Sequence, residues 1–272
     1  MGPGVITVFR WELRKLAAQK RTYLGLGAAV VVPLIFIGVL VFSTGSPDEI
    51  PFGSIVRESG LAIPLVMLLF GSIWLFPLIT ALVAGDIVAS EDANGTLKTI
   101  LTRSVDRGRI FAGKSLAAGL YAALALLLMT FTAGGIGSVL YGFDPVPSLS
   151  GGELSAARAL GATMLSLGVY LLPMLAIASI ALLLSTVTRN SSAAVVGTLI
   201  LSLVMQLLGV FSSLDAIRPY LLTTQFSAWV GLLREPMDWA PVVRAAWVSS
   251  LYAIPALFAA FVVFLRRDVA GG

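Results

Sequence analysis

Hydrophobic residues occur along this chain in long runs that contain no charged side chain. Six such runs, each of at least 20 residues, cover residues 23–42, 61–85, 115–143, 159–188, 190–214 and 245–265. A helix needs about 20 consecutive apolar residues to cross a hydrocarbon layer ~30 Å thick. It also satisfies its own backbone hydrogen bonds there. The pattern therefore predicts an all-α integral membrane protein with six transmembrane helices in a single domain, residues 1–272.

The segment before the first run, residues 1–21, has helical periodicity. Its apolar residues recur at spacings of three and four: Val5, Val8, Phe9, Leu13 and Leu16. Arg14 and Lys15 fall largely outside this stripe, where they can face anionic headgroups. We expect an amphipathic helix along the membrane interface; the alternative is a solvated extension of the first span.

Two further segments lie between the runs. In the connection 86–114, Thr96 follows Asn94-Gly95 and can cap a short helix whose apolar edge contains Leu97, Ile100 and Leu101. In the connection 215–244, residues 221–233 are apolar but too short to span. They form either a re-entrant or interfacial helix, or a loop packed on the bundle.

Composition and charge agree with this architecture and orient it. The chain is 58% hydrophobic and 12% charged, with a mean hydropathy of +0.96, far from the soluble mixture. With both termini placed inside, thirteen of the 18 Lys and Arg residues lie on the cytoplasmic side. We expect a multi-pass protein of the plasma membrane with cytoplasmic termini. The net charge of +4 reflects topology and implies no nucleic-acid partner.

Catalytic chemistry is narrowly limited. The chain has no cysteine and no histidine, which excludes disulfides, Cys/His metal sites and a Ser-His-Asp triad. No Asp, Glu, Lys or Arg lies within a predicted span, which counts against an ion-coupled relay. An almost wholly apolar interior favours an amphipathic or lipophilic cargo.

Two short stretches imitate ATPase motifs. "GRIFAGKS" (108–115) fits the phosphate-loop pattern, and "LSGGE" (149–153) is similar to the signature of ABC-type ATPases. A working phosphate loop lies between a buried strand and a helix. Here charged residues precede Gly108 and a membrane span follows Lys114, so we expect neither binding nor hydrolysis of ATP.

The same stretch has another resemblance. "SEDANGTLKTILTRSVDRGRIFAGK" is similar to the cytoplasmic signature of ABC-2 type permeases, and the matching residues are Glu91, Gly95, Thr96, Leu97, Arg107, Gly113 and Lys114. "WELRKLAAQKR" resembles the interface helix of that family through Glu12, Lys15, Leu16 and Arg21. Ser104 stands where the family often has proline, which leaves the exit from the coupling helix less fixed.

The resemblance implies a transmembrane subunit without cofactors of its own. ATP and Mg would bind to a separate ABC nucleotide-binding ATPase subunit, beneath a homodimer or a heterodimer with a paralogous permease. The coupling residues would be Glu91, Gly95, Thr96, Leu97, Ile100, Leu101 and Arg107, and the interface helix would use Glu12, Arg14 and Lys15 near membrane lipid. The alternative is a non-transporting membrane anchor or sensor that recruits a soluble partner.

Overall fold

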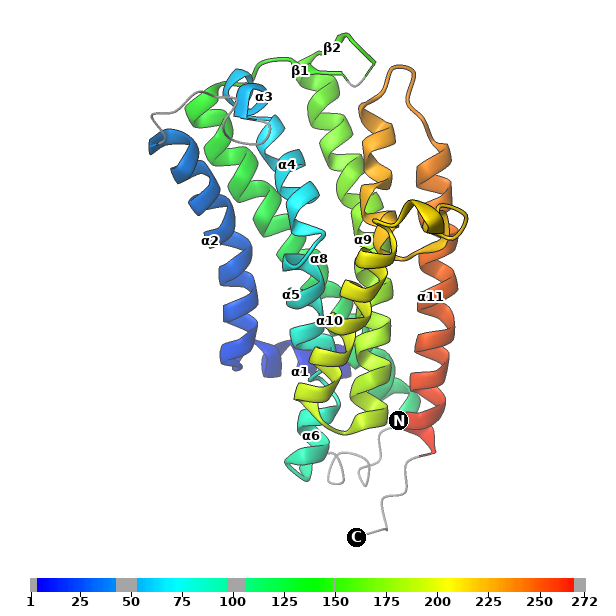
Figure 1. The fold of residues 1–272 in the computed structure, drawn as a ribbon. Helices are drawn as coiled ribbons and strands as arrows, with labels where there is room; N and C mark the ends of the chain where they lie inside the picture. The colour runs from blue at the N-terminus through cyan, green and yellow to red at the C-terminus, as the bar shows by residue number, and fades with distance from the viewer. Residues whose placement is uncertain (1–3, 43–52, 97–105, 149, 267–272) are drawn as a thin grey trace.

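The protein is a bundle of long helices. The computed structural model describes residues 4–42, 53–96, 106–148 and 150–266, most of which are helical, so the predicted all-α class is confirmed. Helix α1 (Val5–Ala17) lies across one end of the bundle, and a short hairpin of β1 (Val146–Pro147) and β2 (Glu153–Leu154) lies at the other (Figure 1). Both termini are at the α1 end.

The long helices have the length and composition of membrane spans. Among the described residues, five helices pass this test alone: α2 (Lys20–Phe42), α8 (Arg107–Tyr141), α9 (Ala156–Thr188), α10 (Ser191–Leu208) and α11 (Ala240–Leu265). A sixth span is formed only if α4 (Ala62–Gly71) and the bent segment that follows it are counted together. The protein is a multi-pass membrane protein with five or six spans.

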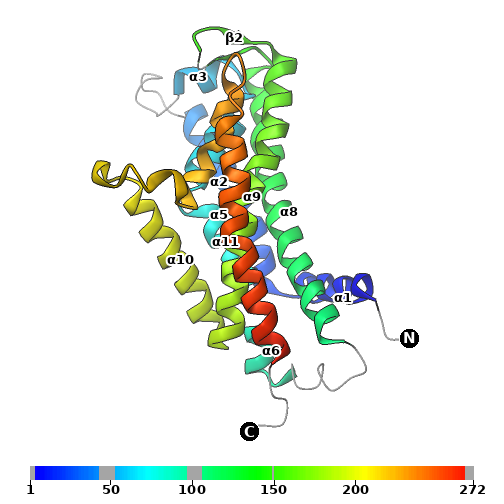
Figure 2. The same ribbon diagram turned by 90° about the vertical axis from the view of Figure 1, so that its right-hand side faces the viewer.

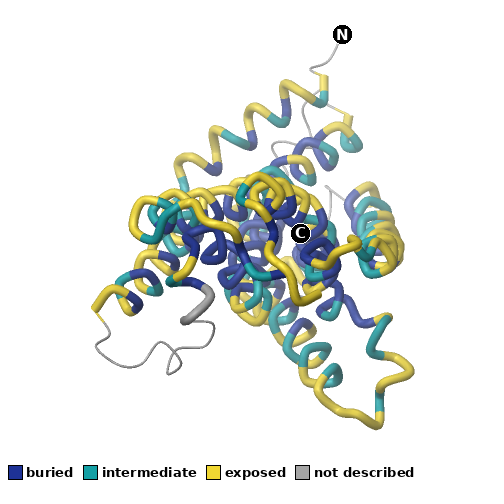
Figure 3. Tube along the Cα trace, turned by 90° about the horizontal axis from the view of Figure 1, so that it is seen from above, coloured by how far each residue is buried: buried dark blue, intermediate teal, exposed yellow. Residues whose placement is uncertain are grey.

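Apolar side chains cover the outside of the bundle as well as its interior. Phe42, Val139 and Phe258 are all exposed on the long helices. Viewed along the bundle, buried positions face the middle and exposed positions face outward (Figure 3). Exposed aromatic and branched residues would be unfavourable in water but match hydrocarbon, which agrees with a membrane location.

Helix α9 is the centre of the bundle. It packs against α5, α8, α10 and α11. Its hydroxyl residues Thr163, Ser166 and Ser179 each donate a hydrogen bond to the carbonyl oxygen four residues earlier. These polar side chains are therefore satisfied within their own helix, and α9 can be buried without unpaired donors.

The second apolar run, 61–85, is bent rather than straight. Helix α4 follows the short α3 (Gly53–Glu58), and α5 (Leu75–Ala84) begins after a break at residues 72–74, where the chain bends by 64°. Pro77 explains the break, because it has no N–H for the carbonyl of Ile73 and its ring collides with that carbonyl. Beside the break, the Tyr170 hydroxyl of α9 donates to the Leu68 carbonyl oxygen at 2.9 Å.

The fifth run ends earlier than the sequence predicts. Helix α10 stops at Leu208, and residues up to 222 form turns with two short 3₁₀ helices, η2 (Ser212–Leu214) and η3 (Arg218–Tyr220). Ser and Asp side chains in this stretch favour turns over helix, which the hydropathy of 190–214 conceals.

The apolar segment predicted at 221–233 is an 11-residue 3₁₀ helix, η4 (Thr223–Leu233), packed on α9 and α11. It begins beside Tyr170, whose ring contacts that of Phe226, and it ends at the hairpin, where Ser148 donates to the Leu233 carbonyl oxygen. Helix α10 and η4 rise in succession along the bundle (Figure 2 shows α10 leaning away from α9).

Candidate functional site

Helix α1 presents an unusual buried face. Val8, Glu12 and Leu16 are its buried residues, spaced four apart on one side of the helix. A carboxylate in the middle of an apolar stripe needs a cationic partner, because an unpaired buried charge is very costly. Helix α1 is a separate element from α2, from which it is divided at Ala18 and Gln19.

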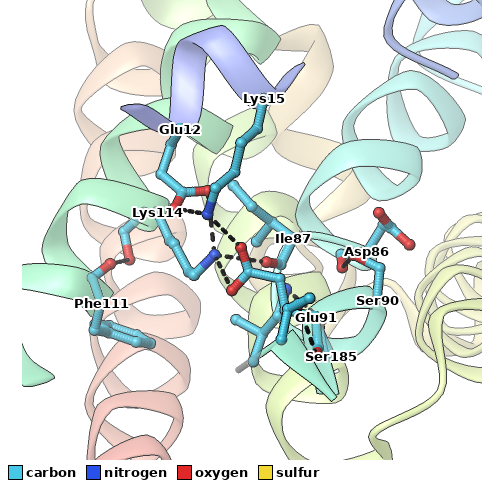
Figure 4. Close-up of polar contacts among 12 residues, drawn as sticks. Glu12, Lys15, Asp86, Ile87, Ser90, Glu91, Phe111, Lys114 and Ser185 are labelled. Carbon is cyan, nitrogen blue, oxygen red and sulfur yellow. Dashed lines mark hydrogen bonds and ion pairs between the residues drawn. The ribbon is translucent and has the colours of Figure 1, made fainter. Parts of the chain in front are cut away.

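Glu12 is ion-paired with a lysine of its own helix and a lysine of α8, and both lysines also pair with a second carboxylate, Glu91. Lys15 lies one turn later on α1, Glu91 lies on the short helix α6 (Ala89–Ala93), and Lys114 lies on α8. Figure 4 shows the four side chains pointing toward one another. We call these residues, Glu12, Lys15, Glu91 and Lys114, the charge ring.

The charge ring is closed by four ion pairs. Lys15 Nζ lies 3.0 Å from Glu12 Oε1 and 2.6 Å from Glu91 Oε1. Lys114 Nζ lies 3.1 Å from Glu12 Oε2 and 2.7 Å from Glu91 Oε2. Each lysine thus bridges both glutamates, and the two positive charges balance the two negative charges.

Lys114 is the most enclosed member of the charge ring. Its side chain is 0% exposed, against 5% for Glu12, 12% for Glu91 and 42% for Lys15. Lys114 Nζ also donates to the Ile87 carbonyl oxygen at 3.0 Å. Lys114 Nζ therefore donates hydrogen bonds to Glu12 Oε2 and to the Ile87 carbonyl oxygen, and Glu91 Oε2 completes its surroundings as an ion-pair partner.

The ion pairs keep Lys15 charged. Partial burial alone would lower its pKa, but attraction to Glu91, a hydrogen bond to Glu91 and similar contributions from Glu12 outweigh burial and raise the pKa of Lys15 above its ordinary value. Lys15 is positively charged at neutral pH, as the charge ring requires.

Backbone packing brings the helices close enough for these contacts. A Cβ on Gly113 would lie 2.7 Å from Val8 Cγ1, so the absence of a side chain lets α1 cross α8 directly beside Lys114. The Ser185 hydroxyl of α9 accepts from the Ala89 N–H at 3.0 Å and fixes the start of α6. A further ion pair, between Arg21 and the buried Asp86, connects the start of α2 to the same region.

The remaining predicted coupling residues lie nearby or outside the described residues. Gly95 ends the turn after α6 with a φ of +68°, a conformation that suits glycine, and the Thr96 hydroxyl donates to the Glu91 carbonyl oxygen at 3.1 Å. Arg107, at the start of α8, donates to the Leu265 carbonyl oxygen at 2.9 Å. Leu97, Ile100 and Leu101 lie outside the described residues, and Arg14 is exposed on α1.

The arrangement is a joint between three helices. Gly108 and Lys114, two fixed positions of the phosphate-loop pattern, lie within α8 instead of in a loop after a strand. The described residues contain no group of three or more carboxylates able to hold a metal ion. The charge ring holds α1, α6 and α8 together at the end of the bundle that bears the termini.

Sequence reasoning selected all four members of the charge ring but did not foresee that they meet. Glu12 and Lys15 were expected to face the membrane surface, and Lys114 to mark the end of a cytoplasmic loop. One signal was present: Glu12 lies four residues from both Val8 and Leu16, on the stripe that α1 buries.

Two relatives with curated descriptions resemble part of the chain. The "Probable ABC transporter permease protein NosY" of Pseudomonas aeruginosa is 31% identical over 126 residues, which cover 46% of this chain and 42% of the relative. A protein of the same description from Stutzerimonas stutzeri is 30% identical over 103 residues, 38% of this chain and 35% of the relative. The matches therefore span less than half of either relative.

A family profile covers much more of the chain. It extends over residues 29–270, from within α2 past the end of α11. The match is long enough to decide membership, and the chain belongs to the family described as "Protein of unknown function (DUF2705)".

Proposed function

We propose that this chain is the membrane permease subunit of an ABC transporter, and that a separate nucleotide-binding subunit hydrolyses ATP. Partial similarity to two proteins described as probable ABC transporter permeases supports the proposal. So does the set of membrane-spanning helices. The finer assignment, an ABC-2 type exporter, rests on the resemblance of residues 91–114 and 11–21 to that family.

The charge ring is the observation that carries the proposal furthest. The connection 86–114 follows α5, with Glu91 near its start on α6 and Lys114 at its end, on α8. Both are ion-paired to Glu12 of α1 or to its neighbour Lys15. A force that a partner applies to residues 86–114, at the end of the bundle that bears the termini, would therefore be transmitted to α5, α8 and α1 together.

This geometry suits a transmission element. An ATPase can drive a membrane protein only through contacts that differ between its two states. In our proposal the ATPase docks on the connection between Glu91 and Lys114, with the apolar edge of Leu97, Ile100 and Leu101 covered by the partner. The buried joint behind the docking surface then moves as one body.

Further features complete the proposal. The subunit functions as a homodimer or with a paralogous permease in the plasma membrane, with both termini cytoplasmic. It exports an amphipathic or lipophilic cargo. The bias of Lys and Arg toward the side of the termini supports the orientation.

Docking is tested with charge substitutions on the apolar edge. A candidate ABC nucleotide-binding ATPase subunit is co-expressed with the chain, and co-purification and ATP-dependent transport into inverted vesicles are measured. Leu97→Asp and Leu101→Asp should abolish both, because each buries an unpaired carboxylate at a cost of at least several kcal/mol. Met237→Asp, at the opposite end of the bundle and outside the spans, is the matched control and should leave both unchanged.

The same experiment distinguishes a transporter subunit from the alternative function. A non-transporting anchor or sensor would bind its soluble partner without ATP-dependent movement of cargo. Retention of the ATPase by Leu97→Asp and Leu101→Asp, with transport at the wild-type rate, would contradict the placement of the docking surface.

A further inference from the structure

A cavity lined by both apolar and charged residues lies far from the charge ring, between η4 and the first turns of α11. Its volume is about 270 Å³. Two arginines line it, Arg234 just after η4 and Arg244 on the second turn of α11, together with one carboxylate, Asp238. The formal charge of the lining is therefore +1.

The cavity lies toward the end of the bundle opposite the termini. The segment that closes it, residues 234–239, follows Leu233, whose carbonyl oxygen accepts from Ser148 in the hairpin region. Glu235 N–H likewise donates to Ser150. Because α11 is a candidate span that begins at Ala240, Arg244 lies near one face of the membrane, at the depth of lipid headgroups.

The walls of the cavity are fixed by packing. A Cβ on Gly231 would lie 2.4 Å from the Asp238 carbonyl oxygen, so η4 and the turn before α11 touch at this glycine. The Asp238 N–H donates to the Gly231 carbonyl oxygen at 3.0 Å. The cavity is thus a feature of the folded bundle.

Of the two arginines in the cavity, Arg234 is weakly paired with Asp238, and Arg244 has no anionic partner among the described residues. Asp238 Oδ1 accepts from the Ala240 N–H at 3.0 Å, and Oδ2 lies 3.8 Å from Arg234 Nη1, too far for a hydrogen bond. For Arg244, no ion pair or hydrogen bond is found with any described residue. A guanidinium group in the headgroup region of a span, without a carboxylate, leaves its donors for an external anion.

Two other polar residues of the cavity have no donor left for a ligand. The Gln225 side-chain amide donates to the Pro219 and Leu221 carbonyl oxygens, and the Ser227 hydroxyl donates to the Thr224 carbonyl oxygen. Their donors are thus already used. The free donors facing the cavity are the Arg244 guanidinium, part of that of Arg234, and the Thr224 hydroxyl, which has no partner among the described residues.

We propose that this cavity binds a phosphate group through Arg244, Arg234 and Thr224. Guanidinium groups match phosphate oxygens in pairs of hydrogen bonds, and a lining charge of +1 suits a monoanionic phosphodiester. At this depth the anion is presented by an acidic phospholipid headgroup, although free phosphate has the same chemistry. This proposal does not depend on coupling to an ATPase.

The test uses the full chain in two arms. In the lipid arm, the protein in phosphatidylcholine nanodiscs is titrated with phosphatidylglycerol, and retained lipid is counted by native mass spectrometry. In the soluble arm, inorganic phosphate and glycerol phosphate are added, and the shift of the thermal unfolding midpoint gives an apparent Kd. Lipid bound near the basic residues of α1 is common to all variants, so only differences between variants are interpreted.

Arg244→Gln should weaken phosphate-group binding about tenfold or more, the effect of losing one charge-assisted hydrogen bond or two. Arg234→Gln should weaken it less, because that side chain is partly engaged by Asp238, and Arg244→Lys should be intermediate. Arg158→Gln, at the same end but ion-paired with Glu235, removes the same charge and should have no effect. If Arg244→Gln fails to fold, Arg234→Gln and Arg244→Lys still test whether the cavity binds a phosphate group.

Loss of binding in the lipid arm alone assigns the site to a phospholipid, and loss in both arms assigns it to the phosphate group whatever its source. The proposal is overturned if wild-type protein binds neither probe. It is also overturned if Arg244→Gln and Arg234→Gln bind as the wild type does, or if Arg158→Gln reduces binding equally.

Discussion

Replacing Lys114 with methionine should destabilise the bundle strongly, although the change keeps a long apolar side chain. The ammonium group is 0% exposed and bridges Glu12 Oε2 at 3.1 Å and Glu91 Oε2 at 2.7 Å. Without it, two carboxylates share only Lys15, which is 42% exposed and partly screened by solvent. Breaking a buried ion pair by removing one partner costs about 3–5 kcal/mol, and we expect a loss of this size.

A double-mutant cycle isolates the interaction. Glu12→Gln combined with Lys114→Met leaves Lys15 and Glu91 as a neutral pair, so the double variant should be more stable than the sum of the single effects predicts, by about 1–3 kcal/mol. The free energy of unfolding is measured in mixed micelles by titration with a denaturing detergent, followed by far-UV circular dichroism. Arg158→Gln, which breaks an exposed ion pair at the other end, should cost less than about 1 kcal/mol.

Two results would refute this reasoning. One is a Lys114→Met protein within about 1 kcal/mol of the wild type, the range typical of exposed pairs. The other is strict additivity of Lys114→Met and Glu12→Gln, which would mean that the two groups do not interact in the membrane-embedded protein.

Three further outcomes are expected. The purified chain alone should show no saturable ATP binding by equilibrium dialysis, because Lys114 is enclosed by carboxylates; binding that Lys114→Ala abolishes would contradict this. A single cysteine at Ser150 should react with a membrane-impermeant maleimide added outside intact cells, whereas one at Ala93 should react only after lysis; the reverse pattern would invert the proposed orientation. Gly60→Ala places a Cβ 2.2 Å from the Gly137 backbone and should lower the free energy of unfolding by about 1–3 kcal/mol or more. The control Gly27→Ala, which has open space around its Cβ, should be neutral or stabilising. Equal effects of the two substitutions on the free energy of unfolding would refute the close contact at Gly60.

The helical class and the position of most helices follow from the sequence because hydrocarbon imposes a simple rule. Runs without charge must form helices that satisfy their own backbone. The same rule fails to locate breaks, because a bent helix and a straight one have equal hydropathy. Pro77 marks the break between α4 and α5, but proline also occurs within the continuous helices α2, α9 and α11 at Pro33, Pro173 and Pro255.

The site shows a different limit. The pattern around Glu91 and Lys114 singles out these residues through a family resemblance, but Lys114 is 102 positions from Glu12, and single-chain periodicity contains no information on such pairings. What decides the contact is the crossing of α1 over α8 at Gly113, a backbone approach that the sequence shows only as one glycine among 27.

The Tyr170 side chain of α9 contacts three other elements of the bundle: α4, α5 and η4. Its ring contacts Phe76 at the beginning of α5 and Phe226 at the beginning of η4, with centroids 5.1 Å and 4.8 Å apart, and its hydroxyl is bonded to Leu68 at the end of α4. The two interruptions of regular helix, far apart in the chain, therefore meet on one side chain. Because packed interiors shift between discrete arrangements and do not deform smoothly, α5 cannot swing at its break without displacing η4. The two discontinuities are therefore mechanically coupled through Tyr170, and neither can rearrange independently of the other.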